Sequence, residues 1–206
     1  MKDAEAKWLA CTEPKDMLRS SDRKLRLFAV ACCRRFGRLL DKDASRQAIE
    51  VAERFADEQA DREELESARS EAVYAPQPTR ASDFAANAAM YAALPSARAA
   101  AYAVCEVTFA LRQDAGRTWQ CDLLREIFGH PYRPVTIERA WRTSNDGAVV
   151  KLAQAIYDER NFAHLPVLGD ALEDAGCRDE LLLEHCRGLG EHVRGCWVLD
   201  LLLDQE

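Results

Sequence analysis

Apolar residues recur at steps of three and four along most of the chain, and this spacing is the strongest constraint on its fold. Between residues 23 and 40 the apolar residues that follow these steps are Leu25, Phe28, Ala29, Cys32, Cys33, Phe36, Leu39 and Leu40. Such steps are the period of one helix face. No segment alternates apolar and polar residues as a strand does. The pattern predicts an all-α fold, an irregular multi-helix bundle or a solenoid-like stack of about ten helices.

Start and stop signals divide this pattern into helices. The predicted helices cover residues 4–12, 23–40, 44–60, 61–74, 83–93, 96–114, 117–128, 148–160, 166–175, 178–186 and 193–203. Ser21, Asp61 and Ser82 are the predicted caps of three of them. No repeat of fixed period is present. We expect one helical domain over 1–206, with a possible subdivision into 1–75, an alanine-rich part at 81–128, and 135–206.

Composition excludes several classes of protein. The net charge of −7 argues against bulk nucleic-acid binding. No run of about 18 apolar residues is present, so we expect no membrane span and no membrane partner. The first residues lack the apolar stretch of a signal peptide, and the eight cysteines are too sparse for a disulfide scaffold. We therefore expect a soluble cytoplasmic protein with free thiols.

Six phrases of the sequence occur together in one known group of proteins. They are WLAC at 8–11, SDRKLRLFAVACCRR at 21–35, LLREIFG at 123–129, LAQAIYDER at 152–160, ALEDAGC at 171–177 and HVRGCWVLDLLL at 192–203. On these phrases the chain resembles a large paralogous family of uncharacterised bacterial helical proteins, in which they recur in the same order around a variable alanine-rich middle. The resemblance covers most of the chain except about residues 60–115. It implies no activity, cofactor or catalytic residue.

A cluster of metal-binding residue types lies near the C-terminus. Its members are Cys177, His185, Cys186, His192 and Cys196. His192 and Cys196 are four residues apart, which predicts that they share one helix face. Three or four of the five could surround a zinc ion at ~2.0–2.3 Å. The spacing matches no zinc signature, and buried cysteines and helix-capping histidines are common, so packing is the favoured interpretation and zinc the alternative.

A second cluster is basic and lies on the predicted helix over 23–40. Its candidate partner-binding residues are Arg23, Arg26, Arg34, Arg35 and Arg38. Such a face could meet phosphates or an acidic partner. From Asp158 onward, however, the chain has twelve acids and four arginines, so an intramolecular match with that acidic end is the simpler interpretation.

No complete catalytic motif is present. The sequence has no Gly-x-Ser-x-Gly elbow and no glycine-rich phosphate loop. The Cys32–Cys33 pair falls in mid-helix among apolar residues, which favours a core role. Glu173 or Asp174 could serve as a base beside a metal. We therefore expect a non-enzymatic protein-interaction or regulatory adaptor without a cofactor. The alternatives are a small metal-dependent hydrolase that uses the C-terminal cluster, and an interaction module with a structural zinc site.

Overall fold

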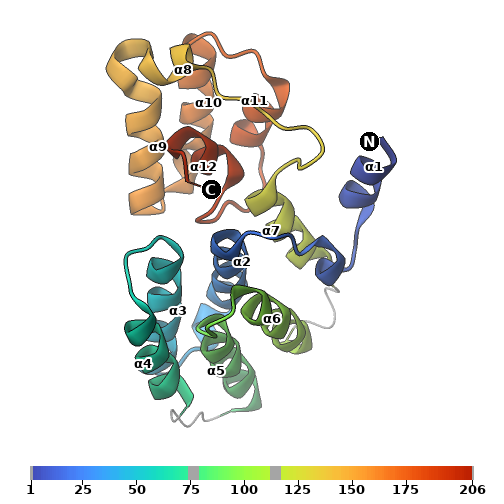
Figure 1. The fold of residues 1–206 in the computed structure, drawn as a ribbon, viewed down its shortest axis with the longest axis vertical. Helices are drawn as coiled ribbons and strands as arrows, with labels where there is room; N and C mark the ends of the chain where they lie inside the picture. Colours follow the sequence, from blue (N-terminus) through green and yellow to red (C-terminus); the bar gives the residue numbers. More distant parts are fainter. Residues whose placement is uncertain (1, 74–78, 112–116, 206) are drawn as a thin grey trace. The chain divides into compact units, whose positions relative to one another are not determined.

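All regular elements in the structure, a computed structural model, are helices (Figure 1). The structure describes residues 2–73, 79–111 and 117–205, and over these ranges no strand is assigned. The prediction of an all-α, multi-helix fold is therefore confirmed. No helix in these ranges is long and apolar enough to cross a membrane.

The chain divides into two compact units. The C-terminal unit comprises Met1–Glu5 and Arg125–Glu206, and the N-terminal unit comprises Ala6–Leu124. Two helices, α1 (Lys2–Ala10) and α7 (Thr118–Phe128), contribute residues to both. The expectation of one domain stays a prediction, because compact units occur both within domains and as separate domains.

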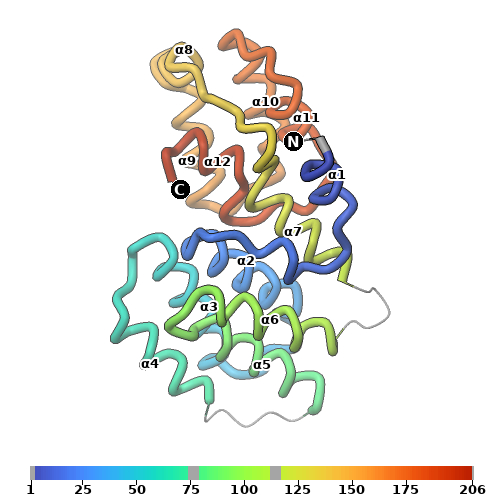
Figure 2. Tube along the Cα trace, turned by 45° about the vertical axis from the view of Figure 1, so that its right-hand side comes forward, coloured from blue at the N-terminus to red at the C-terminus, as the bar shows by residue number. Residues whose placement is uncertain are grey.

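The N-terminal unit is built around α2. Its helices are α2 (Asp22–Arg34), α3 (Asp43–Ala56), α4 (Arg62–Val73), α5 (Arg80–Ala92) and α6 (Ala97–Leu111). Helix α2 packs against α3, α5 and α6, and α5 lies along α6 (Figure 2). The facing sides of α5 and α6 are lined by buried alanines, which allow close helix packing.

The apolar positions that the sequence predicted as core are buried, and so is every other residue from 25 to 33, so α2 is enclosed on all sides there. Leu25, Phe28, Cys32 and Phe36 are all buried, and Phe28 and Cys32 have no exposed surface. The predicted helix is too long, because α2 ends at Arg34 and a short 3-10 turn follows at Gly37–Leu39.

Helix caps agree with the sequence at two positions and differ at a third. The Ser21 side chain accepts a hydrogen bond from the Lys24 amide, and Asp61 accepts one from Glu64. Before α5 the cap is Thr79, and Ser82 is its partner in a reciprocal capping box. The prediction of Ser82 as the cap was wrong, because hydroxyl groups at both ends of such a box can bond backbone amides. The predicted loop over 75–80 lies mostly outside the described residues.

The C-terminal unit consists of short helices around a second core. They are α8 (Arg139–Thr143), α9 (Ala148–Glu159), α10 (Leu165–Asp174), α11 (Glu180–Arg187) and α12 (Trp197–Leu203). Helix α10 packs against α9 and α11, and α12 packs against α9. The predicted helix over 193–203 begins four residues later, at Trp197, and this shift changes the geometry of the candidate site.

We expect Phe28→Ala to lower the free energy of unfolding by about 3–5 kcal/mol, because the side chain is fully buried and its removal leaves a cavity. Urea denaturation measures the loss. The control is Leu9→Ala at a side chain 48% exposed, which should change stability by less than about 0.5 kcal/mol. A loss at position 28 as small as that of the control would show that this face of α2 is not core.

Candidate metal centre

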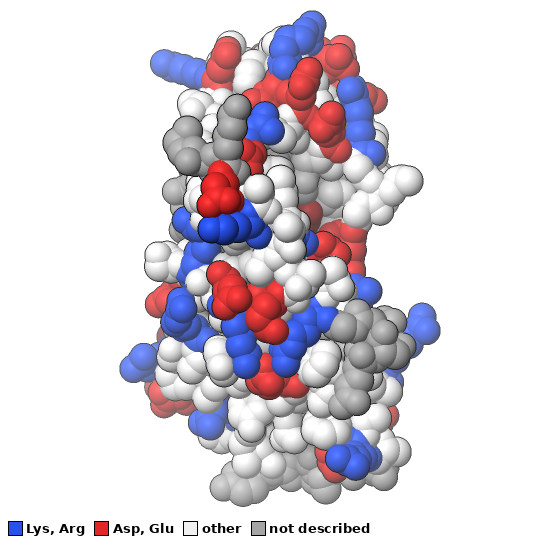
Figure 3. Space-filling model, turned by 90° about the vertical axis from the view of Figure 1, so that its right-hand side faces the viewer, with Lys and Arg blue, Asp and Glu red and all other residues white. Residues whose placement is uncertain are grey.

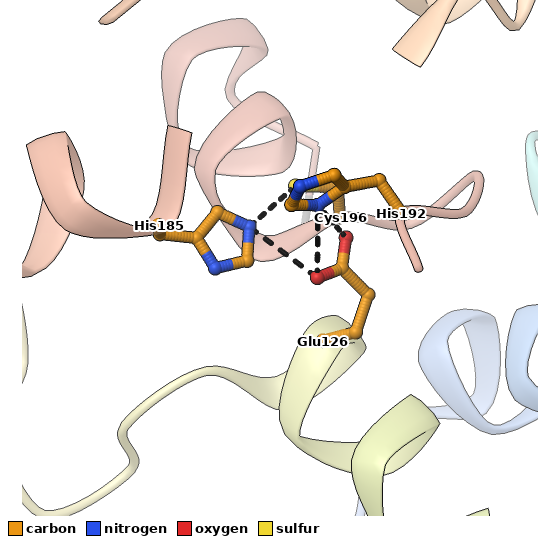
Figure 4. A group of neighbouring side chains, drawn as sticks. All are labelled: Glu126, His185, His192 and Cys196. Carbon is orange, nitrogen blue, oxygen red and sulfur yellow. Dashed lines mark hydrogen bonds and ion pairs between the residues drawn. The ribbon is translucent and has the colours of Figure 1, made fainter. Parts of the chain in front are cut away.

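Four side chains of the C-terminal unit converge on one point (Figure 4). They are Glu126, His185, His192 and Cys196, and one potential ligand atom from each lies within 4.8 Å of the others. Two nitrogens, a sulfur and a carboxylate oxygen form a donor set that suits zinc. Three of the residues were predicted from the sequence, and Glu126 was not.

Glu126 enters the site from the last turn of α7. The helix ends at Gly129, whose φ of +62° suits glycine and whose amide donates to the Arg125 carbonyl over 2.9 Å. A Cβ atom at Gly129 would lie 2.8 Å from Cγ of Trp197. Glycine at this position therefore lets the indole ring pack against the end of α7.

His185 lies in the last turn of α11. That helix starts at its cap Asp179, which accepts a hydrogen bond from the Leu182 amide. Nε2 of His185 lies 3.1 Å from Cys196 Sγ and 3.4 Å from Glu126 Oε2. On the other side of the ring, the Trp197 indole N–H donates to Nδ1 over 3.0 Å.

His192 and Cys196 come from the connection between α11 and α12. Nδ1 of His192 lies 3.1 Å from Glu126 Oε1. Cys196 occupies the N-cap position of α12, and its carbonyl accepts from the Asp200 amide. The prediction that both residues share a helix face was wrong, because residues 188–196 form no helix. A turn brings them together instead: the Cys196 amide donates to the Val193 carbonyl.

The distances between these atoms resemble those between ligands of one zinc ion. Tetrahedral bonds of about 2.0–2.3 Å place neighbouring nitrogen, oxygen and sulfur ligands roughly 3.3–3.5 Å apart. The nitrogen–sulfur separation here is 3.1 Å, and the nitrogen–oxygen separations are 3.1 and 3.4 Å. Small outward movements of the side chains would widen these separations enough to hold the ion.

Burial and Glu126 together shift the pKa values of the three predicted members. Burial lowers the pKa of His185 to about 4, against the opposing charge of Glu126, so the ring is neutral at pH 7. Burial also acts to lower the pKa of His192, but the hydrogen bond and charge of Glu126 outweigh it and raise the pKa overall. For Cys196, burial and then Glu126 raise the thiol pKa well above its usual value. A nearby metal cation is the kind of charge that would favour the thiolate.

The other two predicted cysteines do not join the group. Cys177 and Cys186 are fully buried and belong to the apolar core of the C-terminal unit. Cys186 directly follows His185 on α11, and consecutive helix residues point about 100° apart, so the two face different directions. Burial also raises the pKa of the Cys186 thiol to about 12. The structure thus places both cysteines in packing roles.

The basic residues of α2 are not one solvent-facing set. Arg26 is 2% exposed, and its guanidinium donates to the carbonyls of Ala92, Leu94 and Pro95. This position is corrected from partner binding to packing, since a buried, hydrogen-bonded guanidinium is not accessible.

The remaining arginines differ in their surroundings. Arg23 pairs with Asp57, and Arg34 pairs with Glu50 and Glu53 of α3. Arg35 stacks over the Trp119 ring, and Arg38 is exposed.

The acids considered as catalytic bases lie outside the four-residue group. Glu173 and Asp170 both contact Arg187 of α11, at 2.5 and 2.8 Å. Asp174 is exposed. The carboxylate at the site is instead Glu126, about 60 residues away in sequence, and no local pattern marks it.

Comparison with known proteins adds no relative. No family model matches the chain, and no curated protein or solved structure matches it. The site therefore stands on its geometry.

We expect Gly129→Ala to destabilise the protein more than Gly176→Ala. Both glycines have positive φ, +62° and +93°, so alanine is strained at each, by about 1–3 kcal/mol. Only at Gly129 would the new methyl group also meet Trp197, which adds about 1–3 kcal/mol of overpacking. Denaturant unfolding of both variants measures the difference. Equal losses would mean that Trp197 does not rest on this glycine.

Proposed function

We propose that this chain is a non-enzymatic helical module whose C-terminal unit is held by a structural zinc ion. The observation that carries the proposal is the convergence of Glu126, His185, His192 and Cys196 within 4.8 Å. In a chain segment of short helices, one ion would join the end of α7, the end of α11 and the start of α12. Metal ligation of this kind contributes directly to folding free energy.

Four protein ligands favour a structural role over a catalytic one. Catalytic zinc sites usually have three protein ligands and leave a position for water or substrate. Here the fourth donor is supplied by the chain, and Glu173, the base considered for a hydrolase, contacts Arg187 instead. These two features favour the structural zinc site over the hydrolase.

A protein partner remains the favoured kind of ligand for the module as a whole. On the face drawn in Figure 3, acidic and basic groups are interspersed rather than separated by sign. The net charge is −7, which disfavours nucleic acid. The buried thiols suit a reducing cytoplasm, in which we propose that the protein works.

The proposal predicts about one zinc ion per chain in the purified protein, measured by elemental analysis. His192→Ala and Cys196→Ser should reduce the zinc content to near zero, because each removes a ligand. The control is Cys177→Ala, which alters a cysteine equally buried but outside the group and should leave the zinc content unchanged. Loss of zinc from the control as well, or from none of the variants, would contradict the assigned ligands.

Removal of the metal should also lower the melting temperature. An ion present at about 1,000 times its dissociation constant stabilises the folded state by about 4 kcal/mol. For a chain of this size, that loss corresponds to roughly 10 °C. Calorimetry before and after treatment with a zinc chelator measures the shift, and added zinc should reverse it. A melting temperature that does not respond to the chelator would overturn the structural role.

A further inference from the structure

The hydrogen bond between Trp197 and His185 constrains how His185 can bind a metal. A neutral imidazole carries one N–H, so one ring nitrogen donates and the other accepts. Because the Trp197 indole N–H donates to Nδ1 over 3.0 Å, the His185 proton belongs on Nε2. Nε2 is the atom that faces Cys196 Sγ and Glu126. In this arrangement His185 Nε2 donates to Cys196 Sγ and lies 3.4 Å from Glu126 Oε2.

Zinc at Nε2 requires the opposite arrangement of the same ring. The lone pair must then lie on Nε2, and the proton moves to Nδ1, where metal-bound histidines usually donate to a carboxylate or carbonyl. Here that proton would face another donor, the indole N–H. The indole bond and the zinc bond therefore compete for one ring, and zinc binding must break the first to form the second.

We infer that Trp197 is a positioning residue that weakens zinc binding by holding His185 in the competing tautomer. The inference rests on the proposed zinc site and adds its regulation. Trp197 is well placed for this role, because its ring is 6% exposed and packed against both Gly129 and His130. The indole consequently cannot turn away without cost. The hydrogen bond from Trp197 to His185 therefore lowers the affinity of the site for zinc.

The test compares zinc affinities of variants at position 197, measured by competition with a chromophoric chelator. Trp197→Phe removes the indole N–H, so the variant should bind zinc about 5–10-fold more tightly. A factor of this size corresponds to the net free energy of one neutral hydrogen bond. Replacing Trp197 with benzothienylalanine removes the same N–H and keeps the ring size, so it gives the answer if the Phe variant is poorly folded. The matched control is Trp141→Phe, since Trp141 is also 6% exposed in this unit and should leave affinity unchanged.

A second measurement separates this mechanism from a general packing effect. In ¹⁵N NMR spectra, zinc should move the His185 proton from Nε2 to Nδ1 and release the Trp197 indole N–H, with Trp141 unaffected.

The outcomes separate the inference from the proposed function. If the unaltered protein binds no zinc, the proposed function fails and the inference fails with it. If it binds zinc but the N–H-deleted variants bind with unchanged or weaker affinity, or the indole bond persists in the zinc-bound protein, only the inference is overturned.

Discussion

The C-terminal unit is organised around the buried carboxylate of Glu126. This side chain is 7% exposed, and a carboxylate so far from water must be compensated by donors or by a cation. His185 and His192 both direct ring nitrogens toward it. Its negative charge also raises the pKa of the Cys196 thiol, in addition to the effect of burial. Glu126 comes from the end of α7, and its partners come from the end of α11 and from the turn before α12. The contacts of this one carboxylate therefore hold the three segments together at these ends.

The sequence predicts the helical cores well and their polar details less well. The three-four spacing correctly places Leu25, Phe28 and Cys32 in the core. It misses that α2 is enclosed on all sides, because every residue from 25 to 33 is buried. The same periodicity places Arg26 on the outer half of the helix, and there it fails. Arg26 is buried because three carbonyls around the α5–α6 turn need donors. These carbonyls belong to a turn that is distant in sequence, so the sequence of α2 alone does not predict that Arg26 is buried.

The candidate site shows the same division between local and long-range information. His185, His192 and Cys196 could be predicted because their residue types are rare and gather in a short stretch of sequence. Glu126 could not, since it is one of 35 acids and becomes distinctive only when the fold brings α7 to the cluster. Cys186 was included by proximity in sequence, yet helix geometry turns neighbouring residues in different directions. Spacing along the chain therefore identifies candidates, and the fold selects among them.

Charge balance explains why this set of groups suits a divalent ion. A zinc ion with one carboxylate, one thiolate and two neutral imidazoles has no net charge, so a buried site holds it without further counter-ions. In the hydrogen-bonded arrangement, Glu126 raises the pKa of His192 against the effect of burial, and burial raises the pKa of the Cys196 thiol. The same four side chains can satisfy Glu126 in either way, and the Trp197 bond to His185 influences which arrangement is favoured.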